Sequence, residues 1–200
     1  MILDLTTKIS SEQREKWIGD SKEPHVKSGH IGTHLDTYCK TQIPLEYFKS
    51  RGVFVDVTDF CGEREIEVAD LAKLSVSPDS FVIFRTGQIE RYAYGSEEYF
   101  NEHPQLSKEL IRWLLERKIR FIGIDCAGIR RGEEHRPADI LCEEKGVYVI
   151  ENMCNMGELG SGDFTVYTMW LNDPDMTGLK CRIIAEMQAG LYKTEGFAIE

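Results

Sequence analysis

Residues 29–36 read Gly-His-Ile-Gly-Thr-His-Leu-Asp and place two imidazoles and a carboxylate in one short stretch. The two glycines disfavour a helix, so we expect extended backbone here. Side chains alternate between the two faces of an extended chain, which puts His30, His34 and Asp36 on the same side. Two imidazoles and one carboxylate form a ligand set for zinc or manganese. The alternative that the spacing leaves open is a pair of surface or hydrogen-bonding histidines.

Polar side chains also follow three apolar runs further along the chain. The pairs are Arg85-Thr86, Asp125-Cys126 and Glu151-Asn152. Ligands of α/β sheets collect at the carboxyl ends of parallel strands, so these pairs are candidates for a binding edge. Any sheet must end its strands in polar residues, and this ordinary explanation stays open.

The elements that must position these residues alternate between strand and helix. Apolar runs at 81–84, 121–124 and 147–150 predict buried strands. Between them, 107–117 has helical spacing with Ser107 as N-cap, and a shorter helix is expected from Pro137 to residue 144. Further strands are expected at 2–6, 52–58 and within 164–187. The pattern predicts one α/β domain over residues 1–200, with helices packed on a mixed sheet.

Composition narrows the class of protein. The net charge of −10 argues against a general affinity for nucleic acid or for anionic membranes. The N-terminus has neither a basic region nor a long apolar segment, so we expect a cytoplasmic protein without a signal peptide. The six cysteines, Cys61 among them, are scattered without a CxxC pair. We therefore expect reduced thiols and no four-thiolate zinc site.

Several blocks of this sequence together resemble the cyclase family, which includes bacterial kynurenine formamidase and isatin hydrolase. The blocks are His30-x-Gly-Thr-His34-x-Asp36, residues 2–6, 81–87, 103–107 and 123–125, and 149–159 with the sequence Val-Ile-Glu-Asn-Met-Cys-Asn-Met-Gly-Glu-Leu. The resemblance covers nearly the whole chain in the family's order. It implies a swivelling β/β/α fold, a metal-dependent hydrolase of small amides, lactams or esters, and a homo-oligomer, either a dimer or a tetramer.

The resemblance also implies a set of metal ligands. His30, His34 and Asp36 match the family's first three ligands, and Glu151 matches its late carboxylate ligand. The family has a histidine at the position of Asp139, where a carboxylate shifts the preference from zinc toward manganese or magnesium. His135, one helical turn earlier, is the alternative to Asp139. The implied cofactor, zinc or manganese, would polarise a carbonyl and lower the pKa of a water molecule to supply hydroxide.

The chain departs from the family around the catalytic position. The family's acid/base histidine is replaced by Lys40 and the preceding proline by Tyr38, while Gly128 stands where a serine is common. A dication would lower the pKa of Lys40, so this lysine could donate a proton or stabilise an oxyanion. The alternative is a solvated lysine. Tyr38, Trp17 and Tyr92 are candidates for the wall of an aromatic substrate pocket, with core packing as the alternative for each.

Two readings of the function compete with the metal-dependent hydrolase. One is a cysteine hydrolase that uses Cys126 or Cys39, which requires an electropositive site around the thiol. The other is a family member that has lost its acid/base group and binds a small ligand without turnover. The segment 133–135 is expected to be a solvated loop, with closure over the site as the alternative.

Overall fold

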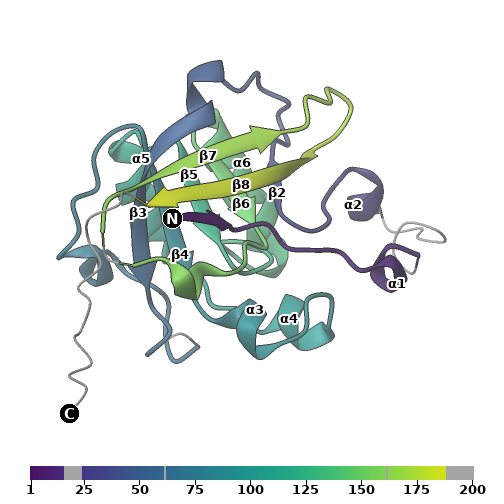
Figure 1. Cartoon of the computed structure of the whole chain (residues 1–200), viewed down its shortest axis with the longest axis horizontal. Helices are drawn as coiled ribbons and strands as arrows, with labels where there is room; N and C mark the ends of the chain where they lie inside the picture. Colours follow the sequence, from purple (N-terminus) through teal and green to yellow (C-terminus); the bar gives the residue numbers. More distant parts are fainter. Residues whose placement is uncertain (16–23, 61, 161, 188–200) are drawn as a thin grey trace, which may run out of the picture.

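The strands form one sheet that closes on itself. The computed structural model describes residues 1–15, 24–60, 62–160 and 162–187. The strand order is β1-β8-β2-β6-β5-β4-β3-β7, and β7 pairs again with β8 (Figure 1). The strands are β1 (Ile2–Asp4), β2 (His34–Asp36), β3 (Lys49–Asp56), β4 (Ser80–Arg85), β5 (Phe121–Ile124), β6 (Tyr148–Glu151), β7 (Phe164–Trp170) and β8 (Gly178–Met187).

The predicted alternation of strand and helix is confirmed in the centre of this sheet. Strands β3, β4, β5 and β6 are mutually parallel, and their pairing joins neighbours along the sheet. The two long helices between them are α5 (Lys108–Glu116) and α6 (His135–Glu144). The Ser107 side chain caps α5 by accepting a hydrogen bond from the Leu110 amide at 3.0 Å. Helix α6 begins two residues before Pro137, which brings His135 into its first turn.

Shorter helical segments occupy the connections. They are α1 (Ser11–Arg14), α2 (Pro24–Lys27), α3 (Gln88–Arg91) and α4 (Glu97–Asn101), with 3-10 turns at Leu45–Phe48, Val68–Leu71, Gly132–Glu134 and Met156–Glu158. No helix among the described residues is long and apolar enough to cross a membrane.

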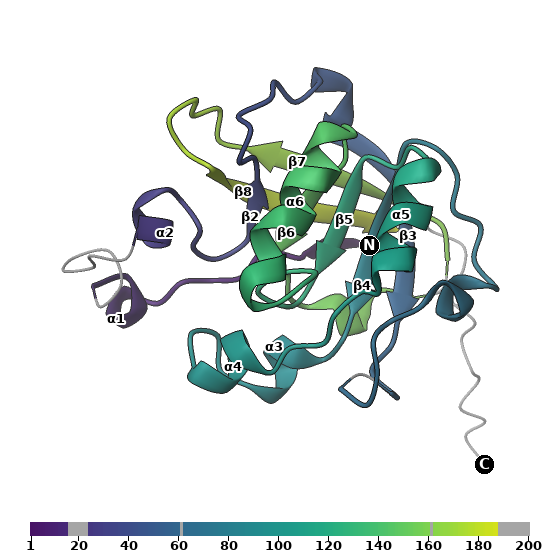
Figure 2. The same cartoon turned by 180° about the vertical axis from the view of Figure 1, so that it is seen from behind.

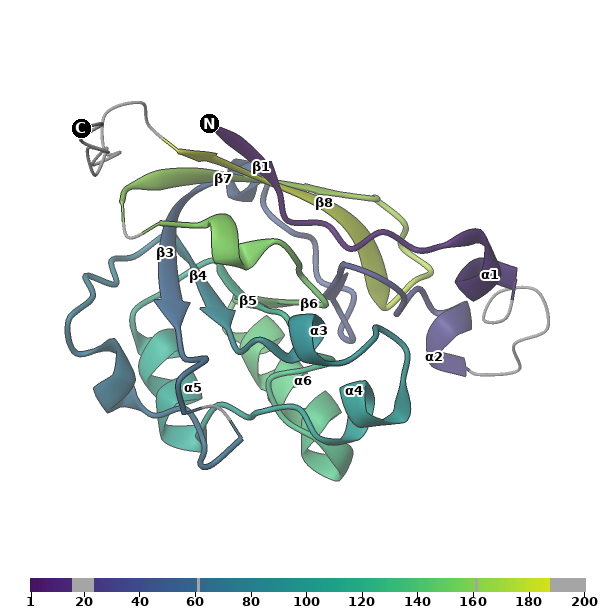
Figure 3. The same ribbon diagram turned by 60° about the horizontal axis from the view of Figure 1, so that its bottom comes forward.

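The sheet separates two apolar cores. In β4, Phe81 and Ile83 belong to the core inside the closed sheet, while Val82 and Phe84 belong to the core beneath the helices. Both faces of the strand are therefore buried, as its continuous apolar run predicts. Figures 2 and 3 show α5 and α6 side by side on one face of β3–β6, away from β7 and β8.

Strand β2 connects the parallel centre to the antiparallel part of the sheet. It pairs antiparallel with β6, where His34 lies opposite Glu151, and with β8, where Asp36 lies opposite Gly178. Leu35 points into the core of the closed sheet. Because neighbours along a strand point to opposite faces, His34 and Asp36 face the helix side, where α6 begins.

Candidate metal centre

The first three predicted ligands do come together, but not by extended backbone alone. Strand β2 starts only at His34, and Gly32 turns the chain with a φ of +64°, a conformation that glycine adopts easily. This turn carries His30 back over the strand, so that its Nδ1 lies 2.9 Å from Oδ1 of Asp36. The expectation of a fully extended stretch was therefore wrong, although its result, three side chains on one side, holds.

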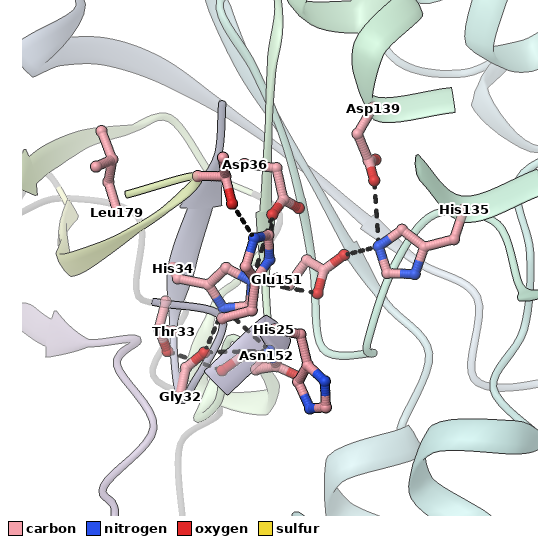
Figure 4. A network of polar contacts seen from close by, with 12 residues as sticks. His25, Gly32, Thr33, His34, Asp36, His135, Asp139, Glu151, Asn152 and Leu179 are labelled. Atoms are coloured by element: carbon pink, nitrogen blue, oxygen red, sulfur yellow. Dashed lines mark hydrogen bonds and ion pairs between the residues drawn. The ribbon is translucent and has the colours of Figure 1, made fainter. Parts of the chain in front are cut away.

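The opposite half of the site comes from β6 and α6. Glu151 at the end of β6 has Oε2 3.5 Å from Nε2 of His34 and Oε1 2.9 Å from Nε2 of His135. Asp139, one turn after His135 in α6, has Oδ2 3.1 Å from the same nitrogen. Figure 4 shows these side chains converging from β2, β6 and α6. Residue 135 thus belongs to the site and not to a solvated loop.

The six residues of this His/Asp/Glu cluster form two overlapping groups that could hold a metal ion. One group consists of His30, His34 and Asp36, and the other of Asp36, His135, Asp139 and Glu151. Within each group the potential ligand atoms all lie within 4.8 Å of one another. Asp36 belongs to both groups, which is the arrangement that a carboxylate bridging two ions requires.

Seven buried polar atoms of the cluster lack hydrogen bonds of good geometry. They are Nε2 of His34, both carboxylate oxygens of Asp36 and of Asp139, Nε2 of His135, and Oε1 of Glu151. Buried polar atoms almost always find a partner. The donor set and its orphaned atoms therefore fit a divalent cation, which accepts nitrogen and oxygen ligands together.

The pKa values of the cluster reflect the crowding of its charges. Burial lowers the pKa of His34, but Asp36 and Glu151 outweigh burial and raise it to about 9. Burial also lowers the pKa of His135, but the carboxylates of Glu151 and Asp139 outweigh burial and raise it to about 12. For Asp139, burial and the Asp36 carboxylate raise the pKa well above its ordinary range despite the contact with His135. Beside these carboxylates each imidazole therefore binds a second proton more tightly than an ordinary histidine does.

Hydrogen bonds to residues outside the cluster fix the orientation of the His30 and His34 rings. His34 Nδ1 contacts the Gly32 carbonyl oxygen at 2.8 Å, which leaves Nε2 facing the carboxylates. Asn152 also donates to Gly32 and in turn accepts a hydrogen bond from the Tyr99 hydroxyl. His30 Nε2 contacts Thr177 Oγ1 at 2.9 Å, so its Nδ1 is the nitrogen that faces Asp36. Such partners select the tautomer and hold the ring of a metal-binding histidine.

Lys40 lies apart from these contacts. Its ammonium is exposed and donates to the main-chain carbonyl of Asp175 at 3.1 Å. The loop that contains it, residues 37–41, wraps around the buried carboxylate of Glu143. This carboxylate accepts hydrogen bonds from Thr37, from the Cys39 amide, and from both the amide and the hydroxyl of Thr41. Glu143 thus positions the segment that follows Asp36.

The edge of the site next to this loop is aromatic. The Tyr38 ring stacks on His30, with ring centroids 5.2 Å apart and an interplanar angle of 25°. The Arg136 guanidinium lies 5.2 Å from the centroid of the Tyr38 ring. Of the other two predicted wall residues, Trp17 lies outside the described residues and Tyr92 directly follows α3.

The other two strand ends serve the structure. The buried Asp125 carboxylate accepts hydrogen bonds from the amides of Thr86 and Gly87 and from the Thr86 hydroxyl, which ties the ends of β4 and β5 together. Arg85 pairs with Asp56 and Glu90. Of the three polar strand ends, Glu151 is the one whose carboxylate enters the cluster.

The thiols do not have the surroundings of a nucleophile. Partial desolvation and the neighbouring Glu143 carboxylate raise the pKa of Cys39, whereas a reactive thiol needs a lowered one. Cys126 is fully buried. The described cysteines 39, 126, 142, 154 and 181 form no disulfide bonds, and Cys61 lies outside the described residues. These observations disfavour the cysteine hydrolase.

Comparison with known proteins decides the family. The model of a family described as Putative cyclase matches residues 3–130, which is more than half of the chain. The chain belongs to the cyclase family. No curated protein sequence matches it.

Solved structures share the cyclase fold along nearly their whole length. A potential metal-dependent hydrolase with cyclase activity is 22% identical, with a TM-score of 0.71 over 92% of this chain and 96% of the other. Isatin hydrolase A from Labrenzia aggregata, bound to benzyl benzoate, is 19% identical, with a TM-score of 0.70 over 92% and 93%. A predicted metal-dependent hydrolase from Bacillus stearothermophilus is 20% identical, with a TM-score of 0.69 over 92% and 97%. The predicted mixed α/β fold is thereby confirmed.

In this cyclase-family chain, the sequence predicts most residues of the His/Asp/Glu cluster, but not the residues that hold their side chains in place. His30, His34, Asp36, Asp139 and Glu151 meet as expected. His135 was expected only as a substitute for Asp139, yet it lies in the cluster beside Asp139 and contacts both that residue and Glu151. Their i, i+4 spacing on a helix is the signal that pairs them. Thr177 carries no local signal, because it lies 147 positions after His30 in the sequence.

Proposed function

We propose that this chain is a metal-dependent hydrolase that cleaves a small amide, lactam or ester. Membership of the cyclase family and the fold shared with metal-dependent and isatin hydrolases support the reaction class. The observation that carries the proposal is the buried cluster itself, with orphaned ligand atoms on His34, Asp36, Asp139 and Glu151. Burying cationic and anionic side chains without hydrogen bonds costs free energy of folding unless a bound ligand interacts with them.

The proposed ligands are His30, His34 and Asp36 on one side and Asp139 and Glu151 on the other. The ion is zinc or manganese, both of which accept mixed imidazole and carboxylate ligands. When bound, such an ion polarises a carbonyl group and makes water acidic enough to supply hydroxide near neutral pH.

The chain's own residues prepare the site for this ion. His34 keeps its proton on Nδ1, where Gly32 accepts it, and presents Nε2. His30 needs its proton on Nε2, where the Thr177 hydroxyl oxygen accepts it, and presents Nδ1. Glu151 faces His34 with one oxygen and His135 with the other, so an oxygen that binds no ion is placed to accept a proton as general base.

The site also has features that suit a small planar substrate. Tyr38 stacks beside His30 at the edge of the cluster, and an aromatic ring there gives a flat substrate an apolar surface. Burial and the carboxylates of Asp36 and Asp139 raise the pKa of the Tyr38 phenol, which keeps it neutral. Lys40 remains our candidate for the proton donor to the leaving group.

We further propose that the protein assembles as a homo-oligomer, a dimer or a tetramer. A groove of about 780 Å³ runs between residues 37–48 and the β7–β8 hairpin, and Lys40 lies on its wall. Leu45 and Phe48 on this groove are 82% and 46% exposed, and Met169 is 42% exposed. Exposed apolar patches of this kind are typical of subunit interfaces. Sedimentation or light scattering of the purified chain measures the subunit number, and a monomer would contradict the proposal.

Elemental analysis and an activity assay test the proposed function. The protein is expected to purify with a divalent metal and to hydrolyse formyl-anilides or lactams, with activity lost on chelation and restored by zinc or manganese. His34→Ala is expected to lose the metal, whereas His103→Gln, which changes a buried histidine outside the cluster, keeps it. A metal load that is unchanged in His34→Ala would overturn the ligand assignment. Metal and ligand binding without turnover would favour the non-enzymatic reading.

A further inference from the structure

The backbone at Gly128 leaves a space that the His135 imidazole fills. A Cβ atom on residue 128 would lie 3.0 Å from Cε1 and 3.1 Å from Nδ1 of His135, which is tighter than nine in ten contacts that real Cβ atoms make. It would also lie 2.9 Å from the Arg130 carbonyl oxygen. Gly128 has a φ of +123°, which other residues rarely adopt. A side chain at 128 would therefore require the ring of His135 to shift by a few tenths of an ångström.

In this position the ring turns its other nitrogen toward the carboxylates. His135 Nε2 lies 2.9 Å from Glu151 Oε1 and 3.1 Å from Asp139 Oδ2 (Figure 4). These are the separations of neighbouring ligand atoms around one cation, since ligands about 2.1 Å from a metal stand roughly 3 Å apart. Nε2 is buried and makes no hydrogen bond of good geometry.

Helix α6 presents both side chains to the same point. His135 and Asp139 are one turn apart, so their side chains share a face of the helix. The side chain of Asp139 is 1% exposed, whereas that of His135 is 28% exposed. His135 is therefore the member of the group nearest to solvent, where an entering ion meets it first.

We propose that His135 is a metal ligand and that Gly128 is the residue that admits it. His135 Nε2 binds a divalent cation together with Asp36, Asp139 and Glu151. This inference rests on the proposed metal-dependent function and extends it, because it assigns His135 and Asp139 to the same ion instead of treating one as a substitute for the other. A set of three carboxylates and one imidazole is rich in oxygen and suits Mn²⁺ or Mg²⁺ better than softer metals.

The competing role for His135 is that of a counter-ion. A protonated imidazole between Asp139 and Glu151 would offset their charges without binding a metal, and the same two contacts would result. The two roles differ in what a metal titration measures. A ligand contributes a directly bound nitrogen, whereas a counter-ion must be displaced before the cation enters.

Binding of Mn²⁺ alone to the full chain, first freed of metal by chelation, separates these roles. Electron paramagnetic resonance of free Mn²⁺ gives the affinity, and electron spin-echo modulation detects histidine nitrogens bound to Mn²⁺. We expect His135→Gln to weaken binding at least tenfold and to remove one nitrogen coupling, in line with the loss of a ligand. Glu133→Gln, an exposed carboxylate two residues away, is the matched control and should behave as the unmodified protein.

The outcomes distinguish this inference from the function on which it rests. If the unmodified chain binds Mn²⁺ and His135→Gln retains both the affinity and the nitrogen couplings, His135 is no ligand and the proposed function stands. If the unmodified chain binds neither Mn²⁺ nor Zn²⁺, the proposed function itself fails. Stronger Mn²⁺ binding in His135→Gln would identify a counter-ion and overturn the inference.

A double-mutant cycle tests the part played by Gly128. Gly128→Ala should weaken Mn²⁺ binding when His135 is present and have little further effect in the His135→Gln background, because the ring it displaces is gone. Backbone strain from the alanine is common to both backgrounds and cancels in the cycle. Circular dichroism and thermal unfolding establish that each variant is folded. An equal loss of affinity in both backgrounds would contradict the space-filling argument, and if Gly128→Ala does not fold, the His135→Gln titration still decides the ligand role.

Discussion

His34 and Glu151 lie opposite each other on antiparallel strands β2 and β6, with His34 Nε2 3.5 Å from Glu151 Oε2. The register of this strand pair brings the potential ligands on β2 next to the Glu151 carboxylate on β6. Glu151 also ends a parallel strand, so one residue connects the motif on β2 with helix α6. Substitutions that leave this pairing intact can therefore probe single contacts around the cluster.

Thr177 is expected to support metal binding without touching the metal. Thr177→Val keeps the shape of the side chain but removes the oxygen that His30 Nε2 contacts at 2.9 Å. We expect the affinity for zinc or manganese to fall by about 10- to 100-fold, the usual cost of losing such a partner. Thr177→Ser keeps the hydroxyl and should restore most of the affinity. Equal affinities for the valine and serine variants, measured by calorimetric titration, would show that the hydroxyl is dispensable.

Glu143 is expected to stabilise the loop after Asp36. Hydrogen bonds to a buried carboxylate contribute about 1.5–3 kcal/mol each, and Glu143 accepts several from Thr37 and Thr41. Glu143→Gln replaces one acceptor oxygen by a donor, so we expect the free energy of unfolding in urea to fall by about 2–4 kcal/mol. Glu144→Gln, the exposed neighbour, should change it by less than about 0.5 kcal/mol. Similar losses in both variants would contradict the role of Glu143.

His103 is expected to make stability sensitive to mild acid. Burial, with help from Arg131 and His135, lowers its pKa to about 4 against a hydrogen bond to the Pro104 carbonyl. The unfolded chain binds this proton near pH 6.5 and the folded protein only near pH 4, so His103 destabilises the fold as the pH falls through that window. The shift corresponds to a loss on the order of 3 kcal/mol.

The measurement is urea unfolding of the unmodified protein and of His103→Gln between pH 7 and pH 4. The glutamine variant cannot bind the proton, so its stability should fall less steeply over this range. Parallel curves for the two proteins would show that His103 takes no part in the acid sensitivity.

Proton donation by Lys40 is tested by replacing its ammonium group. Lys40→His should raise kcat for formyl-anilides by about tenfold, because an imidazole gives and takes protons near neutral pH. Lys40→Gln has no proton to give and should lower kcat. If neither substitution changes kcat, Lys40 lies outside the reacting centre and its contact with the Asp175 carbonyl is its role.

The local sequence determined much of this protein. The run at 81–84 predicts a strand buried on both faces, and Ser107 predicts the start of α5; both expectations are confirmed. The alternation along β2 also puts His34 and Asp36 on one face, and Gly32 permits the turn by which His30 joins them. These features depend on side chains a few residues apart, where backbone geometry alone controls which of them meet.

Only the tertiary structure decided the rest of the site. Glu151 meets His34 through the β2–β6 register, and His135 enters the cluster because α6 begins two residues before Pro137 and Gly128 leaves room for the ring. The placement of Lys40 beside Asp175 likewise depends on a loop held by distant residues. Contacts between segments far apart in the chain arise from packing of the whole sheet, and no short pattern contains that information.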